Sequence, residues 1–120
     1  MLYTVRGLKD GARGVTIRVR VLQKDETRIV KTKDEIEHKV VDTQAGDVTG
    51  IVIMTLWDDT IDKVSEGDVI DIANGYVNKF KGRLRLNIGK YGELSKVEDD
   101  VFPSVRQIIN ASRFKKRGVG

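Results

Sequence analysis

Aromatic and basic residues alternate in one short stretch of the sequence, GYVNKFKGRLRLN at 75–87, whose residue types suit the binding of a polyanion with flat rings. Tyr76 and Phe80 lie four residues apart in this stretch. The basic residues beside and after the second ring are Lys79, Lys81, Arg83 and Arg85. Exposed rings can stack on nucleic-acid bases, while neighbouring cations neutralise the phosphates. The alternative is that these rings are ordinary core residues.

The alternation of side chains along a strand indicates which residues face outward. In 83–88 the leucines and the isoleucine share one face, so the arginines and Asn87 are expected on the other. In 51–57 the face that carries valine, methionine and leucine is expected in the core, which places Trp57 outside. The predicted outer set comprises Trp57, Tyr76, Phe80, Lys79, Lys81, Arg83, Arg85 and Asn87.

The segment before the second ring contains a conflict of parity. Ile70 and Ile72 have the same parity as Tyr76, whereas Val77 has the opposite parity. A regular strand could not bury both isoleucines together with Val77 while leaving Tyr76 exposed. An extra residue at 74–75 would resolve the conflict, because glycine often marks a bulge in a barrel strand. We therefore predict a β-bulge at this position.

The dominant hydrophobic period along the chain is two, which is typical of strands with one buried face. Strands are predicted at 15–22, 29–41, 51–57, 68–80 and 83–89, with a short edge strand at 93–97. Turns are predicted at 33–35, 46–50 and 81–82. Residues 58–67 predict a loop or one short helix. An all-β barrel or sandwich follows from this pattern.

The C-terminal part of the sequence changes character after Pro103. The spacing of Val105, Ile108 and Ile109 predicts a short amphipathic helix. Residues from about 112 onward are basic and glycine-rich, and we expect them to be flexible.

Composition excludes several classes of function. The chain has 120 residues, which suits a single domain, and no cysteine, which rules out disulfides, thiolate zinc sites and cysteine nucleophiles. Neither a membrane span nor a secretory signal is visible, so we expect a soluble protein of the cytoplasm. The formal net charge of +4 is compatible with a polyanionic partner.

Several motifs in the right order resemble the single-domain single-stranded DNA-binding proteins of archaea and their eukaryotic relatives. The motifs are KDGARGVTIRVRVL at 9–22, TLWDD at 55–59, GDVI and NGY before FKGRLRLNIG at 80–89, and EDDVFP at 98–103. These families are related to the DNA-binding domains of replication protein A. The resemblance implies a five-stranded Greek-key OB-fold barrel over 1–103, followed by a C-terminal extension over 104–120.

The resemblance also implies roles for individual residues. It makes Trp57, Tyr76 and Phe80 a stacking trio. The segment TRIVKTKD matches the hairpin after the first barrel strand of the family, so Arg28, Lys31 and Lys33 become candidate contacts to the nucleic-acid backbone. Eukaryotic relatives often carry an aromatic residue where this chain has Asn87, and several archaeal relatives have a long Gly/Arg-rich tail, whereas this sequence stops at RFKKRGVG.

Other candidate chemistry is weaker. The cluster of Asp58, Asp59 and Asp62 could hold a divalent cation, but a solvated loop explains it better. The lone histidine, His38, is interpreted as a surface or packed residue. Lys90 and Tyr91 in the GKYG segment are either a simple turn or peripheral contacts to the ligand. We predict no active site, no metal and no cofactor.

These observations predict a protein that binds single-stranded DNA with little sequence preference and catalyses no reaction. It would protect exposed strands in replication, recombination and repair. We expect a nucleoid-associated monomer that could bind replication or repair proteins and that does not associate with a membrane. Two alternatives stay open at this point. One is an OB module that binds RNA or tRNA. The other is an OB-fold subunit that mainly contacts proteins, for which Ile51 and Ile53 on the outer face are the best support.

Overall fold

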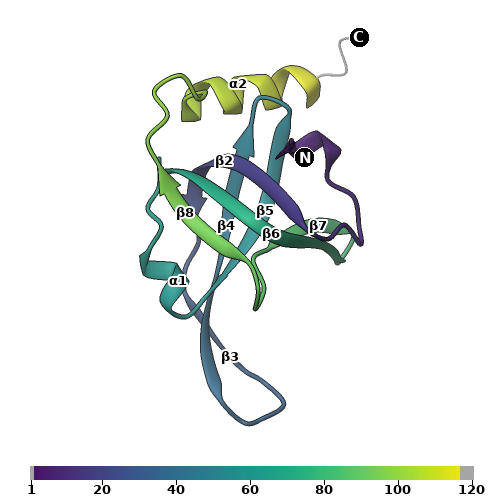
Figure 1. Cartoon of the computed structure of the whole chain (residues 1–120), viewed down its shortest axis with the longest axis vertical. Coiled ribbons are helices and arrows are strands. Elements are labelled where there is room, and N and C mark those ends of the chain that lie inside the picture. Colours follow the sequence, from purple (N-terminus) through teal and green to yellow (C-terminus); the bar gives the residue numbers. More distant parts are fainter. Residues whose placement is uncertain (1, 117–120) are drawn as a thin grey trace.

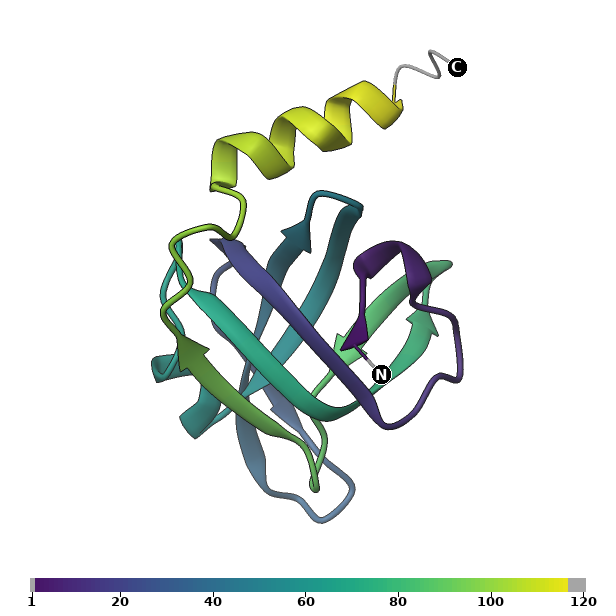
Figure 2. The same ribbon diagram turned by 45° about the horizontal axis from the view of Figure 1, so that its top comes forward.

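A twisted sheet curled into a barrel forms most of the molecule, and one helix lies across its end (Figures 1 and 2). The computed structural model describes residues 2–116. The elements are β1 (Leu2–Tyr3), the 3₁₀ turn η1 (Val5–Gly7), β2 (Val15–Lys24), β3 (Arg28–Lys31), β4 (Glu37–Asp47), β5 (Gly50–Trp57), α1 (Asp59–Asp62), β6 (Val69–Phe80), β7 (Arg83–Asn87), β8 (Glu93–Val97) and α2 (Val105–Lys116). Within these residues no helix is long and apolar enough to cross a membrane.

Five strands close the barrel in the order β2, β4, β5, β7 and β6, and β6 pairs with β2 to complete the ring. The β5–β7 pair is parallel, and the other four pairs of the ring are antiparallel. β1 and β8 extend the sheet beside β2 and β6. This arrangement confirms the predicted five-stranded closed barrel and, beside it, the short edge strand at 93–97. Of the loop and the short helix considered for 58–67, the structure has the helix, α1.

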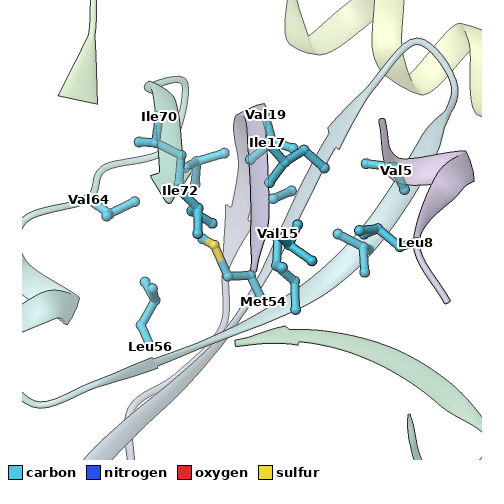
Figure 3. Close-up of a cluster of buried hydrophobic side chains, with 14 of the residues drawn as sticks. Val5, Leu8, Val15, Ile17, Val19, Met54, Leu56, Val64, Ile70 and Ile72 are labelled. Atoms are coloured by element: carbon cyan, nitrogen blue, oxygen red, sulfur yellow. The ribbon is translucent and has the colours of Figure 1, made fainter. Parts of the chain in front are cut away.

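The core follows the period-two pattern of the sequence. Figure 3 shows the buried apolar side chains of several strands meeting inside the barrel. The side chains with no exposed surface there include Val15, Ile17, Val19, Val21, Met54, Leu56, Ile70, Ile72 and Leu86. β-Branched residues dominate this set, which suits a pleated surface buried on one side. The predicted inner faces of β2, β5 and β7 are thereby confirmed.

β6 contains the predicted bulge. Ile17 pairs with Ile72 and Val15 with Gly75, so three residues of β6 span the same distance as two of β2. Asn74, inside this step, has a φ of 56°, a left-handed conformation that asparagine tolerates better than most residues. The extra residue reverses the inward and outward faces of the strand. Ile72 and Val77 are consequently both buried.

Two hairpins give the barrel its protruding edges. β3 pairs only with β4, and the hairpin projects below the barrel (Figure 1). Its turn lies at 33–35, as predicted, with Glu35 at a φ of 67°. At the tip of the β6–β7 hairpin, Lys81 and Gly82 have φ values of 52° and 80°. Two successive left-handed residues are the pattern of the type I′ turn that suits the twist of a hairpin.

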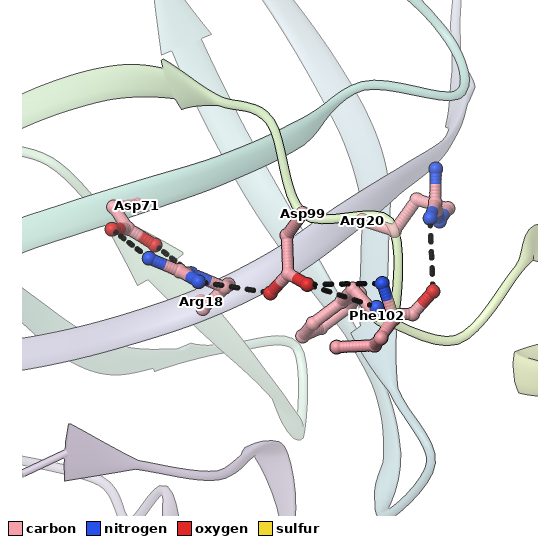
Figure 4. A network of polar contacts seen from close by, with 6 residues as sticks. Arg18, Arg20, Asp71, Asp99 and Phe102 are labelled. Carbon is pink, nitrogen blue, oxygen red and sulfur yellow. Dashed lines mark hydrogen bonds and ion pairs between the residues drawn. The ribbon is translucent and has the colours of Figure 1, made fainter.

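An arginine network fastens the segment after β8 to the outside of the barrel (Figure 4). Arg18 donates to Asp71 at 2.6 Å and to Asp99 at 2.9 Å. The hydrogen bond from Arg18 is the main reason that the pKa of Asp99 lies below its usual range. Arg20 donates to the carbonyl oxygens of Pro103 at 2.6 Å and Phe102 at 3.1 Å. These contacts fix the place from which α2 starts.

α2 packs on the barrel through Ile108, which is fully buried. A Cβ built on Gly46 would lie 3.1 Å from Ile108 Cγ2, so the glycine provides room for this contact. The predicted helix is present, and α2 continues to Lys116, past residue 112, where the flexible tail was expected to begin. Residues 117–120 lie outside the described part of the chain, and the domain boundary at residue 103 stays a prediction.

The bulge leads to a prediction about Gly75. A Cβ at this position would lie 2.9 Å from the carbonyl oxygen of Asn87 and 3.0 Å from Ile72 Cγ2, so Gly75→Ala should lower the free energy of unfolding by about 1–3 kcal/mol. Urea denaturation followed by circular dichroism measures the change. Gly7→Ala is the control, because its Cβ would come no closer than 3.7 Å to Thr4 Oγ1. Equal stability of the two variants would contradict this account of the bulge.

Candidate nucleic-acid interface

A groove of about 860 Å³ crosses the outer face of the barrel, between the β3–β4 hairpin and the β6–β7 hairpin. Its walls and floor come from Arg28, Val30, His38, Val40, Thr55, Trp57, Asp58, Thr60, Tyr76, Asn78, Lys79, Phe80, Arg85, Asn87, Ile88, Gly89 and Lys90. The sheet register explains why these side chains meet. Val40 pairs with Trp57, and Thr55 pairs with Asn87, which in turn pairs with Tyr76. Residues in register across adjacent strands point to the same face.

Three aromatic rings line this groove and stay open to solvent. Trp57 is 43% exposed, Tyr76 41% and Phe80 52%. Large rings in a core would be almost fully covered, so the structure confirms the outward positions that strand parity predicts and excludes the core alternative. Whether the rings stack on bases stays a prediction.

Trp57 is held at the end of β5 by its neighbours on β4. The His38 ring meets the indole edge to face, with centroids 5.8 Å apart and planes at 72°. His38 Nδ1 lies 2.6 Å from Asp58 Oδ2, and the other Asp58 oxygen accepts from the Lys39 amide at 2.9 Å. The hydrogen bond with His38, followed by that from Lys39, holds the pKa of Asp58 below its usual range. Of the two interpretations that the sequence left open for His38, a surface or a packed residue, the contact with Trp57 favours the second, and His38 also lines the groove.

Tyr76 lies against the backbone of the chain that follows β7. A Cβ on Gly89 would come within 2.8 Å of Tyr76 Cε1, and Gly89 also has a φ of 74°. Any other residue there would push the ring out of place. Beside Tyr76, Asn87 Nδ2 donates to Asn78 Oδ1 at 3.1 Å. Side-chain amides both donate and accept hydrogen bonds, so this pair offers polar partners to the edge of a base.

Phe80 lies over a partly buried ion pair. The Arg85 guanidinium carbon is 4.8 Å from the Phe80 ring centroid, and Arg85 Nη1 donates to Asp42 Oδ1 at 2.8 Å. Arg28 donates to the other Asp42 oxygen at 3.2 Å. Partial burial alone would raise the pKa of Asp42, but hydrogen bonds from Arg85 and Arg28 outweigh it and lower the pKa. The negative charge of Asp42 is therefore matched by two arginines of the groove.

The position of Arg85 differs from the sequence-based expectation. A cation on the outer face is free to bind a phosphate only if it is not already paired with a carboxylate. Arg85 is paired with Asp42, and the two side chains are only 17% and 21% exposed. Its guanidinium supports Phe80 from below instead of projecting into solvent. The parity argument places Arg85 on the correct face, but it cannot reveal a partner on another strand.

The groove brings together seven of the predicted site residues. These are Trp57, Tyr76, Phe80, Arg28, Lys79, Arg85 and Asn87. The other four lie outside it. Lys31 is paired with Glu35 at 3.3 Å, Lys33 is exposed at the tip of the β3–β4 hairpin, and Lys81 Nζ lies 5.4 Å from the Phe80 ring centroid. Arg83 borders a separate hollow that includes Ile51 and Ile53.

Sequence reasoning missed Thr55 and Asn78 as parts of this surface, and Asp42 as the partner of two of its arginines. The signal was available for Asp42, because it follows His38 and Val40 at intervals of two residues along one strand and so shares their face. The acidic cluster around Asp58 shows no metal site. Among residues 2–116, no three histidine, cysteine or acidic side chains are placed to hold an ion.

The fold agrees with comparisons to known proteins. The chain belongs to the family of Ssb-like single-stranded DNA-binding proteins with an OB fold, which its residues 8–96 match. The single-stranded DNA-binding protein Ssb of Saccharolobus solfataricus is 35% identical over 104 residues, which cover 87% of this chain and 70% of that protein. The resemblance to this family, predicted from the sequence, is thereby confirmed.

Solved structures show the same fold. A hypothetical protein from Arabidopsis thaliana has a TM-score of 0.71 at 25% identity, over 86% of this chain and 77% of that one. A replication factor A related protein from Methanobacterium thermoautotrophicum has a TM-score of 0.69 at 24% identity, over 82% of this chain and 92% of that one. The predicted OB fold is confirmed.

The exposure of Trp57 leads to a stability prediction with an adjacent control. Trp57→Ala removes a ring that is 43% exposed and should lower the free energy of unfolding by less than about 1 kcal/mol. Leu56 directly precedes Trp57, points to the opposite face of β5 and is fully buried. Leu56→Ala should therefore lower the free energy of unfolding by about 2–5 kcal/mol. Urea denaturation of both variants measures the difference. If the tryptophan variant proved the less stable of the two, the assignment of the faces of β5 would be inverted.

Proposed function

We propose that this protein binds single-stranded DNA with little sequence preference, by stacking bases on Trp57, Tyr76 and Phe80. The observation that carries the proposal is that these three rings, each between 41% and 52% exposed, line one continuous groove. Every base has a flat face, so stacking contributes roughly 1–3 kcal/mol per base with little regard to sequence. The work is binding alone, without a chemical step.

Charge at the edges of the groove supports the same ligand. Lys79 and Lys90 line the groove and form no ion pair within residues 2–116. Lys33 and Lys81 are likewise unpaired there, at the tips of the two hairpins that flank the groove. Each free cation that meets a phosphate releases condensed counterions and so favours binding. Aromatic rings along the floor with cations at the edges match a strand whose bases point inward.

The geometry also bears on strandedness and assembly. Rings can stack only on bases that are not paired and stacked within a duplex, which favours single strands. All the groove residues come from one chain, so a monomer suffices to form the site. We further propose a role in the protection of exposed strands during replication, recombination and repair, inside the cell and beside the chromosome.

Oligonucleotide titration tests the proposal directly. Trp57 is the only tryptophan, so a base stacked on it should quench the intrinsic fluorescence in a saturable way on addition of oligo-dT. The single strand should bind at least about tenfold more tightly than a duplex of equal length, which corresponds to ~1.4 kcal/mol and to less than one good stack. Titration with an RNA strand of matched length and sequence measures the preference between deoxyribose and ribose.

The controls separate stacking from charge. Trp57→Ala, Tyr76→Ala and Phe80→Ala should each weaken binding by about 1–3 kcal/mol, measured by the anisotropy of labelled oligo-dT. Leu2→Ala removes an exposed apolar side chain outside the groove and should leave binding unchanged. Equal affinity for single strand and duplex would show that charge alone drives binding, and the stacking proposal would fail.

Salt dependence distinguishes the two kinds of basic residue in the groove. Lys79→Ala removes an unpaired cation and should reduce the slope of log K against log salt by about 0.7, the value for one phosphate of a single strand. Arg85→Ala should weaken binding through Phe80 but change the slope less, because Asp42 already compensates its charge. Lys9→Ala, an exposed lysine outside the groove, is the control for net charge. A slope that falls equally for Lys79→Ala and Arg85→Ala would contradict the assignment of Arg85.

A further inference from the structure

Tyr91 is a large exposed aromatic residue that the main groove does not include. It is 77% exposed, more than any of the three rings in the groove. It lies at the tip of the turn that follows β7, and its own backbone carbonyl accepts from Asn74 Nδ2 at 3.3 Å. An exposed tyrosine gains little from packing, so its fixed position beside a candidate binding surface requires an explanation.

The turn that carries Tyr91 has a defined shape. Gly92 N donates to the carbonyl oxygen of Gly89 at 3.4 Å, which closes the turn. A Cβ on Gly92 would lie 1.8 Å from the carbonyl oxygen of Ile88, so only glycine fits there. Gly89 in turn lies against the Tyr76 ring. The two glycines therefore hold Lys90 and Tyr91 close to the Tyr76 ring of the groove.

A second hollow joins this turn to the groove. It is lined by Arg13, Asn74, Tyr76, Ile88, Lys90 and Tyr91, together with neighbouring glycines. Tyr76 and Lys90 line both hollows, so a strand that leaves the groove past Tyr76 enters the second hollow directly.

The charges of this hollow suit a phosphate backbone. Lys90 Nζ lies 5.7 Å from the Tyr91 ring centroid, and Arg13 is exposed and forms no ion pair among residues 2–116. The residues lining the hollow include no aspartate or glutamate. Two cations beside an open ring repeat the combination found in the main groove.

The geometry points to a fourth stacking position, in which Tyr91 holds one base of a single strand beyond Tyr76 while Arg13 and Lys90 meet the adjoining phosphate. This inference rests on the proposed function, because it extends the same strand. It predicts a longer footprint than the three rings of the groove provide, and a contribution of Tyr91 that depends on the length of the strand.

Affinity as a function of strand length tests the inference. Labelled oligo-dT of increasing length, from about 4 to about 16 nucleotides, spans the site sizes known for OB folds and is titrated by anisotropy. For the longest strands, Tyr91→Ala should bind about tenfold more weakly than the unmodified chain, a loss within the range of one stacked base. For the shortest strands, which fill only the main groove, the two should bind equally. Thermal melting should be unchanged by the substitution of so exposed a ring.

Two further variants identify the interaction at Tyr91. Tyr91→Phe keeps the ring and should bind every length as the unmodified chain does. Tyr91→Leu keeps an apolar side chain without a ring and should lose affinity as Tyr91→Ala does. Arg13→Ala should reduce the salt slope by about 0.7, and only for the long strands. A leucine variant that binds normally would overturn stacking.

The remaining outcomes separate this inference from the function on which it rests. Trp57→Ala should weaken binding at every length. If it does so while Tyr91→Ala binds all lengths normally, the fourth position does not exist but the proposed function stands. If Tyr91→Ala loses affinity equally at every length, Tyr91 acts on the main groove and the extension is refuted. If Trp57→Ala changes nothing at any length, the proposed function itself fails.

Discussion

The outer surface of this barrel depends on one extra residue in β6. Without the bulge, the strand would keep a single parity, and burying Ile72 would bury Tyr76 as well and expose Val77. The left-handed backbone of Asn74 and the missing side chain of Gly75 make the bulge sterically possible. The side chain of Asn74 also donates a hydrogen bond to the backbone carbonyl of Tyr91. One local irregularity thus supplies both a closed core and a face on which aromatic rings remain open.

A second constraint is the Asp42 carboxylate, which pairs with two arginines of the candidate binding surface. An unpaired Asp42 would repel the phosphates of a nucleic acid and would be poorly solvated in its half-buried position. Arg85 and Arg28 remove both problems, and Arg85 also places positive charge beneath the Phe80 ring. The basic residues of the groove consequently fall into two groups: arginines paired with Asp42, and lysines such as Lys79 that form no ion pair in the described part of the chain and lie at its edge.

Much of this arrangement could be predicted from local sequence, because strand parity is a local property. The inner faces of the strands, the outward position of Trp57 and the bulge at 74–75 all follow from residues within a few positions of each other. The ion pair of Arg85 does not, since it joins residues 43 positions apart on different strands. The role of His38 beside Trp57 is hidden for the same reason: it depends on the register of β4 against β5. Nor does the spacing of apolar residues show that α2 continues to Lys116.

Each ring of the groove is supported by a group that can hold it in place before a ligand arrives. His38 and Asp58 fix the edge of Trp57, Gly89 receives Tyr76, and the Arg85–Asp42 pair lies under Phe80. A ring that is already ordered loses little side-chain entropy on binding, which would otherwise cost roughly 0.5–1.5 kcal/mol for a mobile side chain. That cost is comparable to one stacked base, so under the proposed stacking the supporting residues would decide how much of the stacking energy becomes affinity.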